Sequence, residues 1–345
     1  MELMRFLTRG DVRECLDAVD VPRIVEDTLA RQAKGRTLLP AEGYLAWTNS
    51  DQAYCRSLAM LGAVLSDTGA AGDLYGAKLI NAALNNPSRG LERAGGCMFL
   101  FDPETARPRL MAEGGLLSAL RTAAYTVVSL LRLGPPTWDS LALIGTGMLA
   151  RVHVDLIARY FPEVQDVFSY DLSDDASSAF AAWIGQNHPA LRLHRTRSAR
   201  EAVSSAPVVV TVTTSSDGYI SPGWLTGGTF IAHVSLDDLR PEVFTQATAI
   251  YVDDFDLVAD NPRRVLGRLI QEGIIGRPES TNAPRITGSL GDVILGVIPA
   301  TRPADDIVVS NPFGMAILDV ALLGAVETEA IRRQRGNMLD LMGSR

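Results

Sequence analysis

Leu141-Ala-Leu-Ile-Gly-Thr-Gly-Met-Leu-Ala150 decides how this chain folds, together with Tyr170-Asp171 further along. It reads as a buried strand, a glycine turn and the start of a helix, and the acid closes a second strand. Gly145 permits a sharp turn, Gly147 lets a pyrophosphate approach the backbone, and Ala150 allows close packing of helix on strand. The helix directs its N-terminal amides and the positive end of its dipole toward the phosphates. These features together predict a dinucleotide site.

The acid indicates which dinucleotide binds. Asp171 lies about 20 residues beyond the glycines, where a carboxylate accepts hydrogen bonds from both ribose hydroxyls. A 2′-phosphate there would meet like charge, so the sequence favours NAD over NADP. The expected cofactor contacts are residues of this loop, its acid and the ends of two later strands: Gly145, Thr146, Gly147, Met148, Leu149, Asp171, Thr213 and Ser235.

Composition excludes several classes of protein. The 345 residues are 47% hydrophobic and 21% charged, with a net charge of −8. An acidic balance of this kind leaves no basic footprint for nucleic acid or an anionic membrane. Three widely spaced cysteines and four histidines form neither a disulfide framework nor a metal-binding spacing, so we expect no metal and a reducing, cytoplasmic setting. No signal peptide and no apolar run of about 20 residues is apparent.

The chain divides by its periodicity. Helical spacing covers 11–34 and 116–133, and short strands fit 43–47, 55–60, 74–80, 96–101 and 108–113. Strands then fit 141–145, 166–170, 191–195, 207–213, 229–234 and 249–253, with helices at 148–161, 173–187 and 197–204. A turn at 311–314 precedes an amphipathic helix at 316–335.

This order predicts an α/β fold in which a doubly wound parallel Rossmann sheet is inserted in a second, α+β domain. We expect residues 126–310 to form the NAD-binding domain. Residues 1–125 and 311–345 would form the domain for substrate binding and dimerisation. The cleft between two such domains is a usual place for chemistry.

Several ionisable residues lie at unusual positions, and each can be interpreted either as part of a site or as a structural residue. Lys78 lies in an apolar strand, where a buried ammonium needs a partner or an anionic ligand, or else it lies at an edge and reaches water. Arg121 either clamps a carboxylate or pairs with an acid. Asp237 and its neighbour Asp238 follow a strand of the Rossmann sheet, at its ligand edge or as a helix cap. His233 lies in a predicted strand, and the sequence is equally compatible with a buried core histidine and with one that faces a cleft.

Three motifs in order carry a family resemblance. Gly76-Ala77-Lys78, Arg89-Gly-Leu91 and Ala119-Leu-Arg-Thr-Ala-Ala124 precede the Gly145–Ala150 loop at the usual separation. With them the chain resembles the ornithine cyclodeaminase/mu-crystallin family from about 36 to 325. The Ser-Leu-x-Asp pattern at 235–238 and Asn311-Pro-Phe-Gly-Met-Ala-Ile-Leu-Asp319 resemble its diaminopropionate-biosynthesis branch.

The resemblance implies a reaction and a set of residues. The branch oxidises N-(1-amino-1-carboxy-2-ethyl)-glutamate with NAD, giving 2-oxoglutarate and L-2,3-diaminopropionate for specialised metabolites such as siderophores or antibiotics. Lys78 and Asp237 would be catalytic, the latter with a one-residue shift from the family's aspartate, which falls near Leu236. Arg36, Arg93 and Arg121 would bind substrate carboxylates.

A homodimer is also implied, and other activities stay open. The alternatives are an ornithine or lysine cyclodeaminase, an imine or ketimine reductase, a related amino-acid dehydrogenase, and a non-catalytic nucleotide-binding protein. A dehydrogenase makes NADH stoichiometrically, whereas a cyclodeaminase makes none and releases ammonia.

Overall fold

The computed structural model describes residues 3–67, 69, 72–281, 284–300, 305–341 and 343. The chain forms two compact units, Met1–Arg121 with Gly314–Arg345, and Thr122–Phe313. The sequence placed these divisions at 125/126 and 310/311. The first unit is therefore assembled from both ends of the chain.

The first unit is built on a mixed sheet. Its strands follow the order β16 (Asn337–Leu339), β1 (Met4–Leu7), β7 (Pro108–Glu113), β6 (Ala94–Phe101), β5 (Leu74–Ala83), β4 (Tyr54–Val64) and β2 (Thr37–Leu38), and β3 (Gly43–Thr48) also pairs with β4. Neighbours pair antiparallel except β1 and β7, which run parallel. The register sets Lys78 of β5 between Met60 of β4 and Met98 of β6.

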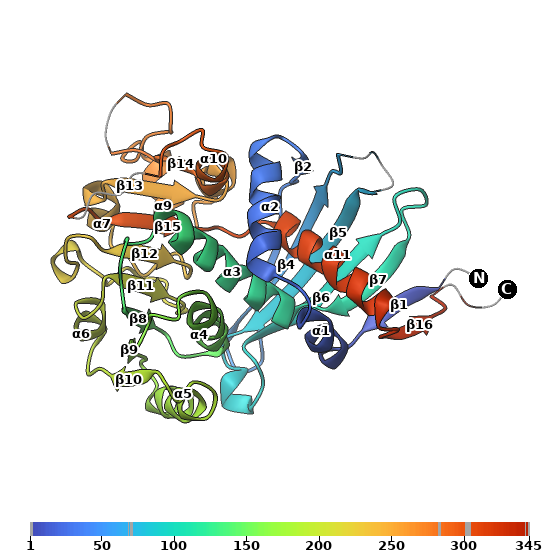
Figure 1. Cartoon of the computed structure of the whole chain (residues 1–345), viewed down its shortest axis with the longest axis horizontal. Coiled ribbons are helices and arrows are strands. Elements are labelled where there is room, and N and C mark those ends of the chain that lie inside the picture. Colours follow the sequence, from blue (N-terminus) through green and yellow to red (C-terminus); the bar gives the residue numbers. More distant parts are fainter. Residues whose placement is uncertain are drawn as a thin grey trace. The chain divides into compact units, whose positions relative to one another are not determined.

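Helices of this unit cover one face of the sheet. Figure 1 shows α11 (Ala316–Arg332), in red, running along the sheet with α2 (Val21–Ala33) and α1 (Arg9–Leu16). The single helix expected over 11–34 is wrong, because Asp20 caps a new helix and Pro22 lies in its first turn. The amphipathic reading of 316–335 is also wrong for its first half. Residues 316–324 are buried all round, since α11 packs on β4, β5 and β6 on one side and on α2 on another.

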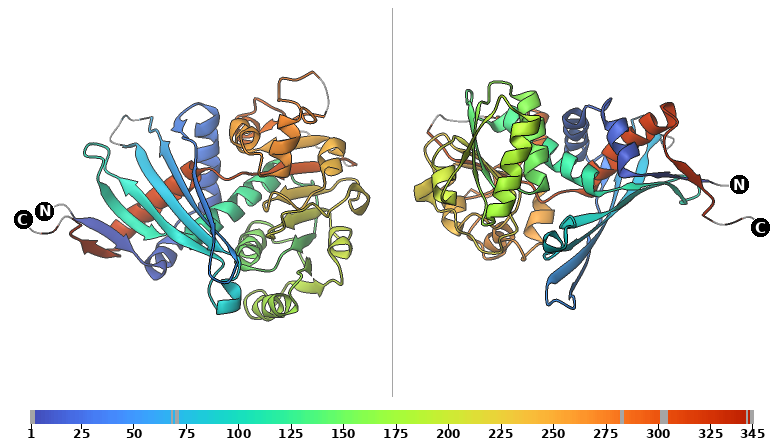
Figure 2. Two further views of the ribbon diagram at one scale, coloured as in Figure 1. Left: turned by 180° about the vertical axis from the view of Figure 1, so that it is seen from behind. Right: turned by 90° about the horizontal axis from the view of Figure 1, so that it is seen from below.

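The opposite face of this sheet is open. In the left view of Figure 2 the strands β4, β5 and β6 lie in front of α11, and no helix of this unit's described residues crosses them. Leu61 and Leu79 project from this face with exposed fractions of 50% and 36%, and on β3 Leu45 and Trp47 are exposed as well. An apolar face of this extent is typical of a surface that another chain covers.

The second unit carries a parallel sheet. Its strands follow the order β10 (Arg192–Arg195), β9 (Asp166–Tyr170), β8 (Ser140–Ile144), β11 (Val208–Thr211), β12 (Phe230–His233), β15 (Val308–Asn311), β13 (Ala249–Val252) and β14 (Gly288–Ser289). The chain proceeds from β8 to one side through β9 and β10 and then returns to β11 on the other side. Ligands bind where the strand order reverses in this way, outside the carboxyl ends of β8 and β11.

Short helices connect these strands. They are α4 (Met148–Tyr160), α5 (Asp174–Asn187), α6 (Ala199–Val203), α7 (Pro241–Gln246), α8 (Phe255–Ala259), α9 (Val265–Gln271) and α10 (Leu290–Ile294). The predicted fold class is confirmed. The sequence missed β15, however, which lies between β12 and β13. The run Val308-Val309 is short and no periodic helix introduces it, so it lacked the alternation used for the others.

Helix α3 (Gly115–Leu133) links the two units along the chain. It is long and apolar enough to cross a membrane, contrary to the expectation that no such run exists. Its most apolar window is, however, 67% buried inside the structure, as in the core helix of a soluble protein.

Candidate functional site

The glycine loop has the geometry that a dinucleotide requires. Gly145 follows β8 with φ +92°, and a Cβ there would meet the carbonyl oxygen of Val212 at 2.9 Å. Gly147 caps α4, and nothing lies within 4 Å of the place a Cβ would take. The first amides of α4, from Met148 and Leu149, therefore begin beside an open position. A bound phosphate can approach this helix end without displacing a side chain.

Asp171 is joined to this loop. One carboxylate oxygen accepts hydrogen bonds from the backbone nitrogen and from the hydroxyl of Thr146, each at 2.8 Å. The other oxygen accepts from the nitrogen of Ser173 at 2.9 Å. These bonds fix the carboxylate at the end of β9. Because each carboxylate oxygen has two lone pairs, the group can still accept further hydrogen bonds. The residues present thus fit NAD, and the role of Asp171 toward the ribose hydroxyls stays a prediction.

Thr213 and Ser235 meet on a carboxylate that the sequence left ambiguous. The side chain of Asp238 is fully buried and accepts from the hydroxyls of Thr213 at 2.6 Å, Tyr219 at 2.7 Å and Ser235. Burial and the nearby Asp238 carboxylate raise the pKa of Tyr219, which keeps this hydroxyl a donor. The structure therefore brings two of the predicted cofactor residues together beside the end of β11.

Asp237 has different partners. One of its oxygens lies 2.6 Å from Nη1 of Arg264, and the other accepts from the nitrogen of Val265 at 3.0 Å, at the start of α9. The preceding residue, Leu236, has φ +76°, which is uncommon for a branched side chain. Both oxygens of Asp237 are thus engaged with protein groups, and its role as acid or base stays a prediction.

His233 lies in the core of the second unit. Its Nε2 accepts from the nitrogen of Asp238 at 3.0 Å, so Nδ1 carries the proton and donates to the amide oxygen of Asn311 at 2.8 Å. Burial lowers the pKa of His233, since no solvent reaches the ring to stabilise its charge. The histidine is a neutral link between β12, β15 and the loop that holds Asp238.

In the first unit, Lys78 and Arg121 share one acid. Nζ of Lys78 lies 2.6 Å from one oxygen of Asp319, and Nε of Arg121 donates to the other at 3.0 Å. The exposed fractions are 2% for Lys78, 8% for Arg121 and 1% for Asp319. Two cations with one carboxylate leave this buried cluster with one surplus positive charge. Desolvated surplus charge is costly unless an anionic ligand meets it.

The positive charge beside it also affects the pKa of the lysine. Burial, followed by the positive charge of Arg121, lowers the pKa of Lys78 to about 8. The carboxylates of Asp319 and, more weakly, Glu42 act in the opposite direction. A lysine with this pKa changes charge within the range where enzymes work.

The backbone fits closely around the arginine. Gly314 has φ +102°, and a Cβ at this position would lie 2.9 Å from Nη1 of Arg121. Any larger residue would therefore press on the guanidinium and move it away from Asp319.

The other two predicted cations lie apart from this cluster. Arg36 precedes β2, donates to the carbonyl of Ser66 at 2.5 Å and lies 3.8 Å from Asp67. Its carbonyl accepts from Leu65, five residues beyond Met60, which is the partner of Lys78 across β4. Five residues of strand span about 16 Å. Arg93 lies past the opposite end of β5, where its carbonyl accepts from the nitrogen of Ala83.

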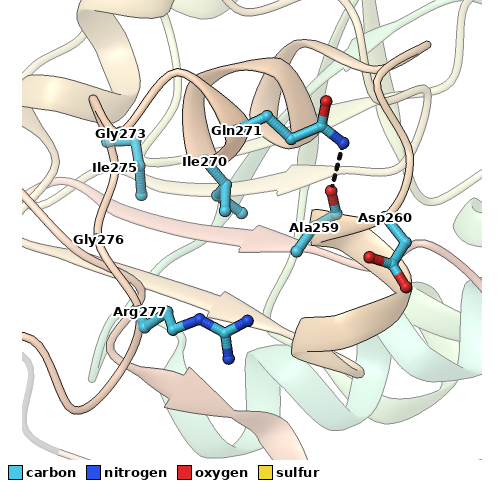
Figure 3. Close-up of a pocket in the computed structure, with 8 residues that line it drawn as sticks. All are labelled: Ala259, Asp260, Ile270, Gln271, Gly273, Ile275, Gly276 and Arg277. Atoms are coloured by element: carbon cyan, nitrogen blue, oxygen red, sulfur yellow. Dashed lines mark hydrogen bonds between the residues drawn. The ribbon is translucent and has the colours of Figure 1, made fainter.

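A pocket of about 410 Å³ opens in the second unit (Figure 3). Arg277 and Asp260 border it, Arg277 lies over the ring of Phe255, and Gln271 donates to the carbonyl of Ala259 at 2.7 Å. The predicted site residues are not among those that line it. The pocket is therefore separate from the glycine loop and from the Lys78–Asp319–Arg121 cluster.

Sequence reasoning missed Asp319 as a site residue. The signal was present, because Asp319 is one carboxylate within the apolar stretch Ala316-Ile-Leu-Asp-Val-Ala-Leu-Leu323. A charged residue in such a stretch is buried only when it is paired. What the sequence does not contain is the identity of its partners, which lie about two hundred residues away.

The chain matches a known protein family. A model of the ornithine cyclodeaminase/mu-crystallin family matches residues 3–334. The chain belongs to this family. N-((2S)-2-amino-2-carboxyethyl)-L-glutamate dehydrogenase of Staphylococcus aureus is 33% identical over 269 residues, or 78% of each chain.

Two solved structures are also similar. That of CmnK is 50% identical with a TM-score of 0.93 and covers 100% of both chains. An archaeal alanine dehydrogenase dimer with bound NAD is 23% identical with a TM-score of 0.81, covering 99% of this chain and 100% of that one, and shows the shared fold. The predicted family and the predicted class, an oxidoreductase of amino-acid metabolism, are confirmed by these relatives, and NAD agrees with them.

Proposed function

We propose that this protein oxidises the secondary amine of N-(1-amino-1-carboxy-2-ethyl)-glutamate with NAD, giving 2-oxoglutarate and L-2,3-diaminopropionate. The observation that carries the proposal is the buried Lys78–Asp319–Arg121 cluster with its surplus positive charge. The Staphylococcus aureus relative supports it, since that dehydrogenase is named for the same substrate skeleton.

The reaction breaks one carbon–hydrogen bond and then one carbon–nitrogen bond. The Gly145–Ala150 loop would hold NAD, which when bound would supply the acceptor for the hydride that leaves the glutamate Cα. The amine loses its proton at the same stage, and the resulting carbon–nitrogen double bond is hydrolysed by one water. The oxidised carbon becomes the ketone of 2-oxoglutarate, and the nitrogen leaves with diaminopropionate.

The chain's own residues hold the substrate for this step. Arg121 presents a planar fork that matches a carboxylate, and Lys78 adds a point charge beside it. Asp319 holds both cations in place while neutralising only one of them. The amine must be neutral when the hydride leaves. Lys78 favours this by its positive charge, or accepts the proton when it is itself neutral.

The decisive experiment measures products. Purified protein with NAD and the proposed substrate should form NADH, 2-oxoglutarate and diaminopropionate in equal amounts. A cyclodeaminase given ornithine or lysine would instead release ammonia without net NADH. If NADH appears with alanine or proline and not with the proposed substrate, the reaction class stands and this substrate does not.

We predict that the enzyme prefers NAD to NADP because of Asp171. Asp171→Asn, which removes the charge but keeps an oxygen for Thr146, should weaken NAD binding about tenfold or more. Leu172 is 93% exposed, so Leu172→Arg in the same variant should add a partner for a 2′-phosphate without disturbing the core. Fluorescence titration with both cofactors checks this. Equal affinity of the unmodified protein for NADP and NAD would refute the ribose role.

We predict a homodimer through the open face of the first unit. Leu45, Trp47, Leu61 and Leu79 lie on that face by register and are exposed. The archaeal alanine dehydrogenase, described as a dimer, supports it. Sedimentation at micromolar concentration should give the mass of two chains, and Leu61→Glu should shift it toward one. A wild-type monomer would contradict the assignment.

Carboxylate binding should weaken above pH 8. Lys78 is positively charged below its pKa of about 8 and neutral above it, so its attraction for a carboxylate disappears as the pH rises. We expect the inhibition constant of 2-oxoglutarate, which has no amine to titrate, to rise about tenfold between pH 7 and pH 9.5. A constant that does not change, or that falls, would show that Lys78 does not bind the carboxylate as a cation.

A further inference from the structure

Asp238 is a fully buried carboxylate that is surrounded by hydroxyl groups. Thr213 and Tyr219 donate to one of its oxygens at 2.6 and 2.7 Å, and Ser235 donates to the other. Each of these hydroxyls has a single proton, and that proton is directed at Asp238. The group that they surround therefore acts only as an acceptor, which is the behaviour of an ionised carboxylate.

No lysine or arginine in the described part of the chain forms an ion pair with this carboxylate. Arg264 reaches the same loop, but its Nη1 pairs with Asp237 at 2.6 Å. The ring of His233 lies 3.9 Å from Asp238 and is neutral, because its Nε2 accepts from the backbone nitrogen of Asp238. A buried charge is costly unless it is paired or hydrogen-bonded. The hydroxyls offset part of that cost, and a cationic ligand would offset more of it.

The carboxylate lies near the glycine loop, at the carboxyl ends of two strands. A Cβ on Gly145 would meet the carbonyl oxygen of Val212 at 2.9 Å and the nitrogen of Thr213 at 3.3 Å. Ser235 follows β12, and its nitrogen donates to the last carbonyl of β11 at 3.0 Å. Through Thr213 and Ser235, Asp238 is therefore held at the ends of β11 and β12, next to the loop that would hold the pyrophosphate.

The order of the strands indicates which half of NAD extends over this edge. The strands β9, β8, β11 and β12 are successive neighbours (Figure 1), with Asp171 directly after β9 and the glycine loop after β8. With the adenosine ribose at Asp171 and the phosphates at the start of α4, the remaining half of the dinucleotide extends toward β11 and β12. That half carries the nicotinamide. Its ring is positively charged in NAD⁺ and neutral in NADH.

We infer that the carboxylate of Asp238 acts as a counter-charge for the oxidised nicotinamide and strengthens the binding of NAD⁺ relative to NADH. Asp238 is then a positioning residue that acts through its electric field, from behind the hydroxyls of Thr213 and Ser235, and transfers no proton. A fixed negative charge in a partly buried place attracts the cationic ring and loses that attraction once the ring is reduced. The inference rests on NAD binding and on the ribose role of Asp171, and not on the identity of the substrate.

The test measures binding without turnover. Calorimetry gives the dissociation constants of NAD⁺, NADH and ADP-ribose, which lacks the nicotinamide, for the unmodified chain and for Asp238→Asn. The substitution keeps an oxygen acceptor for the hydroxyls and removes the charge. In the variant NAD⁺ should bind about tenfold more weakly, while the constants of NADH and ADP-ribose should change by about twofold or less.

Two further variants separate the charge from the fold. Asp253→Asn removes another buried carboxylate, which follows β13 and is separated from β12 by β15. It should leave the ratio of the NADH constant to the NAD⁺ constant unchanged. Tyr219→Phe keeps the charge of Asp238 but removes one of the donors that offset it, so this ratio should rise.

A ratio in Asp238→Asn equal to that of the unmodified chain would overturn the inference and leave Asp238 with a structural role only. So would a ratio that does not rise in Tyr219→Phe, a variant that tests the charge even if Asp238→Asn does not fold. Because none of these measurements involves the amine substrate, the proposed oxidation stands or fails separately.

Discussion

Lys78→Ala is expected to lower kcat/KM by about one and a half to nearly four decades, with little change in NAD affinity. Truncating one member of a buried charge pair at an interface costs about 2–5 kcal/mol, and a lost contact to a substrate carboxylate belongs to the same class. Lys78 is 2% exposed and lies 2.6 Å from Asp319, so its ammonium cannot be replaced by water without rearrangement. Steady-state rates with the proposed substrate, measured on the variant and the wild type, give the change in kcat/KM.

The chain supplies its own control, because Lys34 and Lys78 are its two lysines. Lys34 follows α2 on the surface, so Lys34→Ala should leave kcat/KM unchanged. Arg121→Ala should lower kcat/KM by about as much as Lys78→Ala does, because both cations contact the same carboxylate. Turnover near the wild-type rate in either variant would remove that residue from the site.

Asp319→Asn is expected to destabilise the protein by about 3–5 kcal/mol. The substitution keeps the size of the side chain but leaves Lys78 and Arg121 buried without a counter-charge. For a unit of this size the unfolding temperature should fall on the order of 10 °C. Calorimetry or circular dichroism follows the transition, and bound NAD is kept at one concentration because ligands shift it.

Two further variants identify the cause of this loss. Glu327→Gln removes the partner of Arg109, whose side chain is 29% exposed, and should cost much less because water can solvate the arginine that remains. Adding Lys78→Met to Asp319→Asn removes one of the two stranded cations and should recover part of the stability. An unchanged unfolding temperature in Asp319→Asn would show that the charge of Asp319 does not stabilise the folded protein.

The nucleotide half of the fold was predictable because its signals are local. A buried strand, Gly145, Gly147, a helix and Asp171 fall within about thirty residues, and each has a conformational reason to be where it is. The structure adds that Thr146 is bonded directly to Asp171, which joins the two parts of the motif.

What the sequence could not provide depends on distant pairings. β15 is inserted between β12 and β13 although it follows both in the chain. Asp319 reaches Lys78 across 241 residues, and no spacing rule links them. The family resemblance favoured Asp237 over its neighbour Asp238, but it gave no partner for either. The structure gives the first an arginine and the second three hydroxyls.

The arrangement of α11 has a consequence for biosynthesis. Strands β4, β5 and β6 are made early, yet the helix that covers them begins at Ala316. At about 5–20 residues per second, the ribosome needs roughly 10–40 s to pass from residue 121 to that helix. During that interval the sheet lacks its cover, and Lys78 and Arg121 lack their acid. The nascent first unit thus keeps its apolar strands accessible to chaperones until α11 leaves the exit tunnel.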